Sequence, residues 1–457
     1  MKFGTDGVRG VANVALTPEL AFKIGQAAGR WLVVAGEQGK VLIGRDTRVS
    51  GSMLGAALAS GFCSVGISVD SVGVFPTGGI SYLARTQEYC LAAVISASHN
   101  PAPDNGIKLM TSSGTKIPTE LERFIEDNLN VESTDRPVAE GVGHISTGVA
   151  GAERYLNWLC TLVPERLEGM TIAIDAANGA ASHLGVEVFK MLGANVLPTA
   201  CNPDGMNINA QCGATHPDTI LELTRKHQAD LGVAYDGDAD RAVFSDSEGR
   251  LINGDRMMAV WCSHWMKHGT LNPPIVVGTV MSNGGFGAFM EKCGIQLIRT
   301  DVGDKYVSAK LSEINGKVGG EQSGHIIFPE HGPTGDGLVT ALQLARVIRR
   351  EGKSAADLYG DFENWPQLLV NVQVDRKEGW ESDTDLQAAI SDAQRELTDR
   401  GRVNVRASGT QPMLRVMVEA DDSALRDAVC DRIVSKMLER LGGKIYSRVD
   451  LTHALGD

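Results

Sequence analysis

Three segments of this 457-residue chain repeat one pattern, and the repetition constrains the fold more than any other feature of the sequence. In each segment a run of β-branched residues reaches a polar or glycine-rich turn, and small residues typical of a helix start follow. Such strand–turn–helix units are the building blocks of α/β domains. The segments are VLIGRDTRVSGSMLGAAL from Val41, TIAIDAANGAASHLGVEVF from Thr171 and IVVGTVMSNGGFGAFM from Ile275.

The C-terminal part of the chain follows a different pattern. LLVNVQVD, RVNVRAS and PMLRVMVEA alternate between apolar and polar residues, as half-exposed strands do, and DSALRDAVCDRIVSKMLERL has helical periodicity. A chain of this length divides into several domains. We therefore predict three similar α/β domains with mixed sheets and a C-terminal α+β domain. The predicted limits are 1–150, 151–252, 253–364 and 365–457.

The composition of the chain indicates which kinds of binding partner and which cellular location to expect. A net charge of −13 argues against a surface for duplex nucleic acid, although a small anionic substrate could still bind in a locally basic cleft. The eight cysteines form no C-x-x-C pair, which favours reduced thiols. The start, MKFGTDGVRG, lacks the apolar segment of a signal peptide, and no run has the length of a membrane span. We expect a cytoplasmic protein without nucleic-acid or membrane partners.

The stretch AYDGDADRAVF places three like charges within five residues, at Asp236, Asp238 and Asp240. Residues two apart on an extended segment point to the same side, so the three carboxylates are expected to converge. Oxygen ligands favour Mg²⁺ or Ca²⁺, but Ser247 occupies the position where an EF-hand needs Glu. A solvated acidic loop is the alternative. Apolar residues on both sides favour a metal site.

The strand-like LAAVIS ends in Ser98-His99-Asn100-Pro101, which cannot continue a strand or a helix. A cap or an Asn-Pro turn explains this sequence without any chemistry. Alternatively, Ser98 is a serine displayed at the carboxyl end of a strand, where α/β folds place their chemistry. As a phosphoserine it would carry nearly two negative charges, which the cation of the acidic loop would balance.

A further pair of residues has metal-like spacing. His264 and His268 lie four apart in SHWMKH, but Trp265 replaces the Glu of an H-E-x-x-H metalloprotease motif. We interpret this segment as an amphipathic helix.

Four motifs in order, SASHNP, DGDADR, GGEQSGH and RASGTQP, resemble the α-D-phosphohexomutase family across the whole chain. The resemblance implies four domains around a central cleft, each contributing one motif. It also implies a phosphoserine at Ser98 and Mg²⁺ held by Ser98 together with the three aspartates. The catalytic residues that it implies are Ser98, Lys108, Arg9, His99 and Arg241.

The same resemblance implies a set of residues that bind the sugar and its second phosphate. In the sugar motif these are Glu321, Ser323 and His325, with Gly303 and Asp304 from a neighbouring loop. In the phosphate motif they are Arg406, Ser408, Gly409, Thr410 and Arg415. Thr5 is expected to face the cleft, and Arg45 and Arg48 are expected to form domain salt bridges or to contact ligand. The chain departs from the usual family pattern at Gln411, Gln322 and Asp304, where Glu, Met and His are common.

Asp304, TGDGLVTALQLARVI and PDGMNINAQCGATHP resemble the bacterial branch of the family that acts on glucosamine phosphate. This implies interconversion of glucosamine 6-phosphate and glucosamine 1-phosphate through a sugar 1,6-bisphosphate, by a monomer or homodimer. The alternatives are a branch that acts on mannose or glucose phosphate, a Mg²⁺-dependent sugar phosphatase with an Asp nucleophile, and a non-catalytic sugar-phosphate binding protein.

Overall fold

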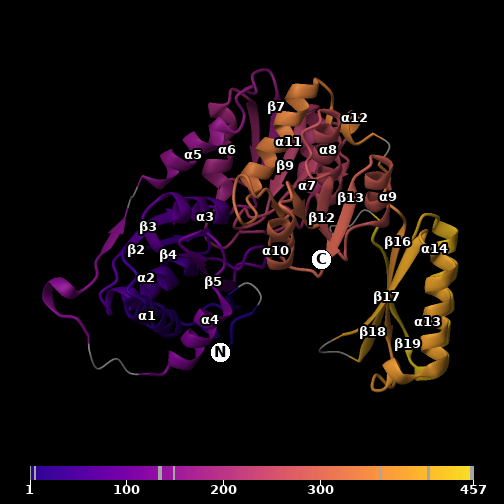
Figure 1. The fold of residues 1–457 in the computed structure, drawn as a ribbon, viewed down its shortest axis with the longest axis horizontal. Coiled ribbons are helices and arrows are strands. Elements are labelled where there is room, and N and C mark those ends of the chain that lie inside the picture. The colour runs from indigo at the N-terminus through magenta and orange to yellow at the C-terminus, as the bar shows by residue number, and fades with distance from the viewer. Residues whose placement is uncertain are drawn as a thin grey trace.

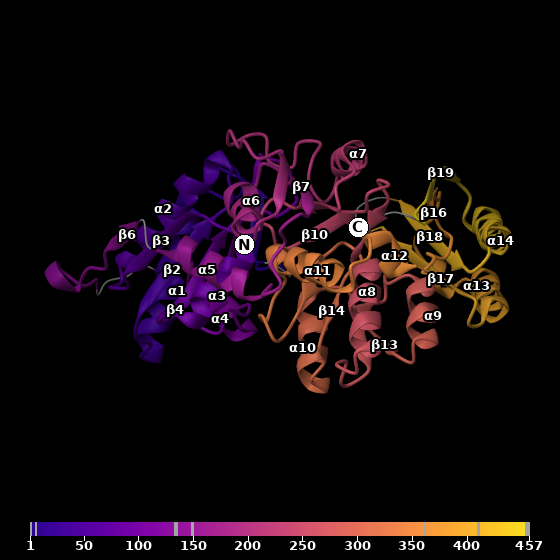
Figure 2. The same cartoon turned by 90° about the horizontal axis from the view of Figure 1, so that it is seen from above.

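The computed structural model describes residues 2–4, 7–131, 136–147, 150–360, 362–408 and 412–452. The described strands form four separate sheets that follow one another along the chain. In Figure 1 they make an arch, with the first sheet at its indigo end and the fourth at its yellow end. Figure 2 shows the same order from above, with the second and third sheets between the ends.

The first sheet is mixed. Its strands are β1 (Val8–Val11), β2 (Lys40–Arg45), β3 (Val69–Val74), β4 (Tyr89–Ile95), β5 (Asp104–Thr111) and β6 (Ile145–Thr147), in the spatial order β1-β5-β4-β2-β3-β6. β2 runs parallel to β3 and β4, whereas β5 is antiparallel to β4 and β1. The helices of this segment are α1 (Pro18–Ala35), α2 (Val49–Cys63), α3 (Thr77–Thr86), α4 (Thr119–Asn128) and a 3-10 turn at Ala139–Gly141.

The second sheet is also mixed. Its strands are β7 (Thr171–Asp175), β8 (Asn195–Thr199), β9 (Leu231–Tyr235), β10 (Ala242–Ser245) and β11 (Leu251–Ile252), ordered β11-β10-β9-β7-β8. β7 is parallel to β8 and β9, and β9 is antiparallel to β10. The helices are α5 (Gly151–Thr161), α6 (Ala181–Met191) and α7 (Asp218–His227).

The third sheet repeats the mixed arrangement with shorter strands. They are β12 (Ile275–Thr279), β13 (Gln296–Thr300), β14 (Gly319–Gly320) and β15 (Ile326–Ile327), ordered β13-β12-β14-β15. β12 is parallel to β13 and β14, and β15 is antiparallel to β14. The helices are α8 (Gly254–Lys267), α9 (Gly284–Lys292), α10 (Asp304–Ile314), α11 (Gly337–Glu351) and α12 (Ala355–Tyr359).

The fourth sheet differs because all its strand pairs are antiparallel. Its strands are β16 (Gln367–Gln373), β17 (Gly401–Ala407), β18 (Met413–Ala420) and β19 (Lys444–Asp450), ordered β17-β18-β16-β19. The helices are α13 (Thr384–Leu397), α14 (Ser423–Leu441) and a 3-10 turn at Trp380–Ser382.

The apolar core separates the fourth sheet from the first three. One continuous cluster of buried side chains joins the first three sheets, and a separate cluster fills the space between the fourth sheet and its helices. A polar contact links the third and fourth segments, because Asn283 Nδ2 donates to Glu419 Oε2 at 3.0 Å. Within the part of the chain that the structure describes, none of the helices is apolar over the length needed to cross a bilayer.

The predicted fold class is confirmed. The three repeated segments form β2, β7 and β12, each followed by a helix, and the alternating C-terminal segments form β16, β17 and β18. The domain limits that we predicted stay predictions.

Candidate active site

Ser98 lies three residues beyond the end of β4 on a tight loop. Its backbone is in the left-handed region, with φ of 53°, and its side chain is buried. This conformation is uncommon outside glycine and indicates a loop whose shape is imposed by its surroundings. The turn therefore directs the Ser98 hydroxyl to one defined position.

Arg48 is the residue that imposes this shape. It is fully buried, its Nε lies 2.9 Å from Asp46 Oδ2, and its Nη2 donates to the Ser98 carbonyl at 2.8 Å. It also donates to the carbonyl oxygens of Asn100 and Pro101. Of the two alternatives expected for Arg48, the structure shows a salt bridge, formed within the first segment with Asp46 two residues away, and the ligand contact stays a prediction. Arg45 likewise donates to the neighbouring Asp46 carbonyl at 3.1 Å.

Two further hydrogen bonds hold the Ser98 loop, one of them from the segment of the second sheet. Asn209 Nδ2 donates to the Ser98 carbonyl at 2.9 Å, and the Ser98 N–H donates to Ser96 Oγ at 2.9 Å. The sequence analysis missed Asn209, Ser96 and Asp46. The only signal was their position in polar stretches beside strand ends, which many loop residues share.

The acidic loop follows β9 directly. Asp236, Asp238 and Asp240 are buried, and one oxygen of each lies within 4.8 Å of the others. They converge through a tight turn in which Ala239 has φ of 57°, so the prediction of an extended segment is wrong in its geometry although right in its result. A turn forms here because Asp and Gly favour it over a strand.

The two loops meet directly. Ser98 Oγ donates to Asp236 Oδ2 at 2.6 Å, and the side chains lie 138 residues apart in the sequence. Gly237 permits this approach, because a Cβ at that position would lie 2.5 Å from the Ser98 carbonyl oxygen. The contact puts a serine hydroxyl against three buried carboxylates.

The charge in this loop is only partly balanced by the chain itself. Lys108 Nζ lies 2.9 Å from Asp238 Oδ2 and 3.5 Å from Asp240 Oδ2, and Thr77 Oγ1 donates to Asp238 Oδ2 at 2.8 Å. Asp238 Oδ1 and Asp240 Oδ1 are buried without a hydrogen-bond partner among the described residues. Thr77 is a further residue that the sequence analysis missed.

The electrostatics of the three aspartates differ. Burial and the charges of Asp240 and Asp238 raise the pKa of Asp236 well above its usual range. Burial also opposes the charge on Asp240, but Lys108, His325 and Arg241 together outweigh it and hold the pKa of Asp240 well below its usual range. Buried oxygens without partners and mutually repelling carboxylates fit a hard divalent cation, which prefers oxygen ligands.

The other predicted catalytic residues lie around this contact. His99 Nδ1 is 3.4 Å from Ser98 Oγ, and the Arg241 N–H donates to Asp236 Oδ1 at 3.2 Å. Arg9 lies on β1 opposite Gly106 of β5, the strand that also carries Lys108. Thr5 lies outside the described residues.

The sugar motif lies beside the acidic loop. His325 Nδ1 is 3.6 Å from Asp240 Oδ1, and its Nε2 accepts from the Gly335 N–H at 3.2 Å, which directs the Nδ1 proton toward Asp240. Glu321 Oε1 accepts from the Gly303 N–H at 2.9 Å, and Ser323 Oγ lies 3.5 Å from Glu321 Oε2.

Asp304 lies near Lys108 and the acidic loop. It begins α10, and it shares with Lys108 and Asp240 the lining of one small cavity of about 40 Å³. The structure therefore gathers the serine, acidic and sugar motifs from three sheets around one position.

The phosphate motif lies elsewhere. Arg406 of β17 faces Arg415 of β18 across the fourth sheet, and Arg415 Nε is buried without a hydrogen-bond partner among the described residues. Ser408 is buried, and its carbonyl accepts from Lys377 Nζ at 2.7 Å. Gly409, Thr410 and Gln411 lie outside the described residues. In Figure 1, β17 and β18 lie on the opposite limb of the arch from β4 and β5.

Known proteins resemble the chain over nearly its whole length. It matches four domain families described as phosphoglucomutase/phosphomannomutase: domain I over residues 1–136, domain II over 153–249, domain III over 253–365 and the C-terminal domain over 369–436. It is 46% identical to the phosphoglucosamine mutase of Desulforamulus reducens, over 94% of this chain and 98% of that protein. It is 44% identical to the phosphoglucosamine mutase of Brevibacillus brevis, over 96% of this chain and 99% of that protein.

Solved structures have the same fold. A phosphoglucomutase/phosphomannomutase family protein from Burkholderia thailandensis superposes with a TM-score of 0.80, at 22% identity, over 96% of this chain and 98% of that chain. The extent of the sequence similarities, together with the geometry of the serine, acidic and sugar motifs, leads to one conclusion: the chain belongs to the α-D-phosphohexomutase family.

Proposed function

We propose that the chain interconverts glucosamine 6-phosphate and glucosamine 1-phosphate through a phosphoserine at Ser98 and a glucosamine 1,6-bisphosphate intermediate. The observation that carries this proposal is the 2.6 Å contact between Ser98 Oγ and Asp236 in a buried acidic loop. Similarity to phosphoglucosamine mutases over nearly the whole chain supports the choice of amino sugar. A cytoplasmic location and a monomeric or dimeric state remain predictions.

Asp236, Asp238 and Asp240 are the residues that would hold Mg²⁺, together with an oxygen on Ser98. Asp238 Oδ1 and Asp240 Oδ1 are buried and make no hydrogen bond within the described part of the chain, which supports this assignment. Bound there, Mg²⁺ would supply positive charge beside the transferring phosphoryl group, whose transfer depends on positioning and electrostatics.

The chain's own residues position the reacting groups. In the forward step a sugar hydroxyl oxygen forms a bond to phosphorus while the bond from phosphorus to Ser98 Oγ breaks. The proton that the sugar hydroxyl loses is transferred, in net terms, to Ser98 Oγ, which then donates it in the hydrogen bond to Asp236 Oδ2. Lys108 lies 2.9 Å from Asp238 and can donate to the phosphoryl oxygens from the same side. Transfer of the substrate's original phosphate to Ser98 reverses these bond changes.

The sugar and the distal phosphate require separate contacts. Glu321, Ser323 and His325 present a carboxylate, a hydroxyl and an imidazole beside Asp240, and these groups would bind sugar hydroxyls. Two arginines that face each other across a strand pair repel unless an anion lies between them. Arg406 and Arg415 form such a pair, which supports their assignment to the phosphate that is not being transferred.

The test compares kcat/KM for glucosamine, glucose and mannose 6-phosphates with Mg²⁺ and a trace of the matching bisphosphate. We expect glucosamine 6-phosphate to give the highest value, with the 1-phosphate as product and phosphate found on the peptide that contains Ser98. A preference for mannose or glucose phosphate would overturn the substrate but not the mutase chemistry. Release of inorganic phosphate would indicate a phosphatase, and binding without turnover would indicate a sugar-phosphate binding protein.

A further inference from the structure

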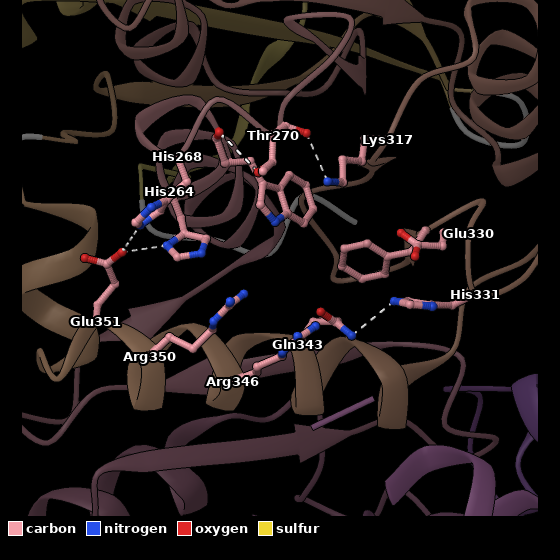
Figure 3. A pocket seen from close by; sticks show the side chains of 12 residues that line it. His264, His268, Thr270, Lys317, Glu330, His331, Gln343, Arg346, Arg350 and Glu351 are labelled. Atoms are coloured by element: carbon pink, nitrogen blue, oxygen red, sulfur yellow. Dashed lines mark hydrogen bonds and ion pairs between the residues drawn. The ribbon is translucent and has the colours of Figure 1, made fainter. Parts of the chain in front are cut away.

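A second cluster of metal-type ligands lies far from the serine loop. His264 and His268 lie one turn apart on α8 and at its C-terminal boundary, and both rings point at Glu351, the last residue of α11 (Figure 3). Glu351 Oε1 lies 2.7 Å from His264 Nδ1 and 2.8 Å from His268 Nε2. The interpretation of SHWMKH as a helix is confirmed through Lys267, where α8 ends. The sequence spacing could not reveal a carboxylate 83 residues away.

The ligand set suits a transition metal. The three ligand atoms all lie within 4.8 Å of one another, and imidazole nitrogen with one carboxylate oxygen is the donor set that Zn²⁺ prefers. Both rings aim at a single carboxylate oxygen, so one cation can replace the two contacts with small side-chain movements. His268 is half-exposed, which leaves its ring free to adjust.

The carboxylate already has the outer partner that metal ligands usually have. Lys267 Nζ lies 2.7 Å from Glu351 Oε2, the oxygen that the histidines do not contact. Ligating carboxylates in metal sites are commonly held by such a hydrogen bond. The ammonium therefore orients Glu351 and leaves Oε1 for the cation.

The cluster also has an open side. A cavity of about 460 Å³ adjoins it, with Trp265, Lys317, Arg346 and Arg350 among its other lining residues. A zinc site with three protein ligands keeps its fourth position for water or another small ligand. The cavity provides that space, and its basic residues suit a water-derived or anionic ligand (Figure 3).

Helix α11 separates this cluster from the acidic loop. At its first residue the Gly337 N–H donates to the Ala239 carbonyl of the acidic loop, and at its last residue lies Glu351. At 1.5 Å per residue, the helix spans about 21 Å between these ends. A cation bound at one end of α11 is therefore too far from a cation at the other end for the two to share a ligand.

We propose that His264, His268 and Glu351 form a second metal site, which binds Zn²⁺ or a similar transition-metal ion, ties α8 to α11 and keeps one position open to the cavity.

The experiment uses the full chain, stripped of metal with a chelator and then kept in saturating Mg²⁺. Zn²⁺ is titrated calorimetrically into the unaltered protein, His268→Ala and Glu351→Gln. We expect each variant to lose one Zn²⁺ equivalent or to bind it at least about tenfold more weakly, because loss of even an outer partner of a metal ligand has that effect. Co²⁺ in place of Zn²⁺ should give the visible absorption of a tetrahedral site only in the unaltered protein.

His227→Ala is the matched control, since it removes an exposed histidine on α7, outside the cluster. Circular dichroism checks folding, and the half-exposed position of His268 makes its alanine variant the safer of the two. Zn²⁺ that displaces Mg²⁺ from the acidic loop would bind equally to all the proteins. Identical Zn²⁺ stoichiometry and affinity in the unaltered protein and His268→Ala would overturn the proposal.

Discussion

The two ligand clusters at the ends of α11 differ in how their charges are satisfied. The acidic loop is buried and offers only oxygen ligands, and Asp238 Oδ1 and Asp240 Oδ1 make no hydrogen bond among the described residues, although His325 Nδ1 lies 3.6 Å from Asp240 Oδ1. In the His264–His268–Glu351 cluster, each carboxylate oxygen of Glu351 already has a partner within the chain. Under the proposed function the first cluster needs a cation to balance its three carboxylates, whereas the second is already a complete hydrogen-bonded group before the proposed metal binds.

The largest expected effect is the loss of mutase activity when the Ser98 hydroxyl beside the acidic loop is removed. We predict that Ser98→Ala lowers kcat for the mutase reaction at least about a thousandfold, because the phosphoryl group loses its acceptor. A coupled assay for glucosamine 1-phosphate formation measures this loss. Ser52→Ala, an exposed serine on α2, is the control and should retain full activity. Retained activity in Ser98→Ala would favour an aspartate nucleophile and contradict the proposed phosphoserine.

The next effect concerns the positioning of the serine. Arg48→Lys keeps the charge but cannot contact Asp46 and three carbonyls together, so the Ser98 loop is expected to shift. We predict that kcat falls about a hundredfold while KM changes little, since small misplacements of reacting groups have this cost. Stopped-assay kinetics and phosphorylation of Ser98 by the bisphosphate provide the measurement.

Arg48→Ala separates positioning from stability. It leaves Asp46 buried without its ion-pair partner, which should lower the free energy of unfolding by about 3–5 kcal/mol. Should Arg48→Lys show normal kcat at a normal melting temperature, Arg48 would be a structural residue only.

A third prediction concerns the helix that connects the clusters. Asp336 caps α11 by accepting from the Leu338 and Val339 N–H groups, and burial raises its pKa to about 6. Because this value exceeds the unfolded value of 3.8, the folded state binds more protons between pH 3.8 and 6. Through this group, acidification therefore stabilises the folded protein.

Asp336→Asn should remove that contribution. When the pH falls from 7 to 4, the free energy of unfolding of the variant is expected to change less favourably than that of the unaltered protein. The difference is on the order of 3 kcal/mol, which corresponds to a two-unit shift in the pKa of Asp336. Denaturant unfolding at a series of pH values measures the difference. Glu120→Gln, at an exposed position on α4, is the control. Parallel pH profiles for Asp336→Asn and the unaltered protein would show that Asp336 has an ordinary pKa.

The smallest effect concerns the second cluster without metal. His268→Ala removes a half-exposed contact with Glu351, and such contacts are worth about 0.2–1 kcal/mol. We predict a decrease of that size in the free energy of unfolding in the presence of a chelator, and a larger decrease when Zn²⁺ is present. An equal decrease under both conditions would mean that the cluster is only a hydrogen-bonded clamp.

The sequence predicted one cluster and not the other for a physical reason. Asp236, Asp238 and Asp240 lie within five residues, so a single turn brings them together, and SASHNP stands at a strand end that the pattern of apolar residues reveals. His264 and His268 are brought together by their helical spacing, but Glu351 joins them only because α8 packs against α11, which no local pattern encodes. The role of Arg48 was hidden similarly: GRDTRVSG shows an arginine beside a strand end, but the carbonyls that it contacts lie about fifty residues later.

The backbone at Ser98 also restricts which amino acid can serve as nucleophile. Threonine also carries a hydroxyl that can accept phosphate, but a β-branched residue is strongly disfavoured at φ of 53°. The choice between these two alcohols at position 98 is consequently made by main-chain sterics and not by reactivity. A library that places each hydroxyl-bearing residue at position 98 and selects for mutase activity should therefore yield serine alone, unless the turn is also rebuilt with a neighbouring glycine.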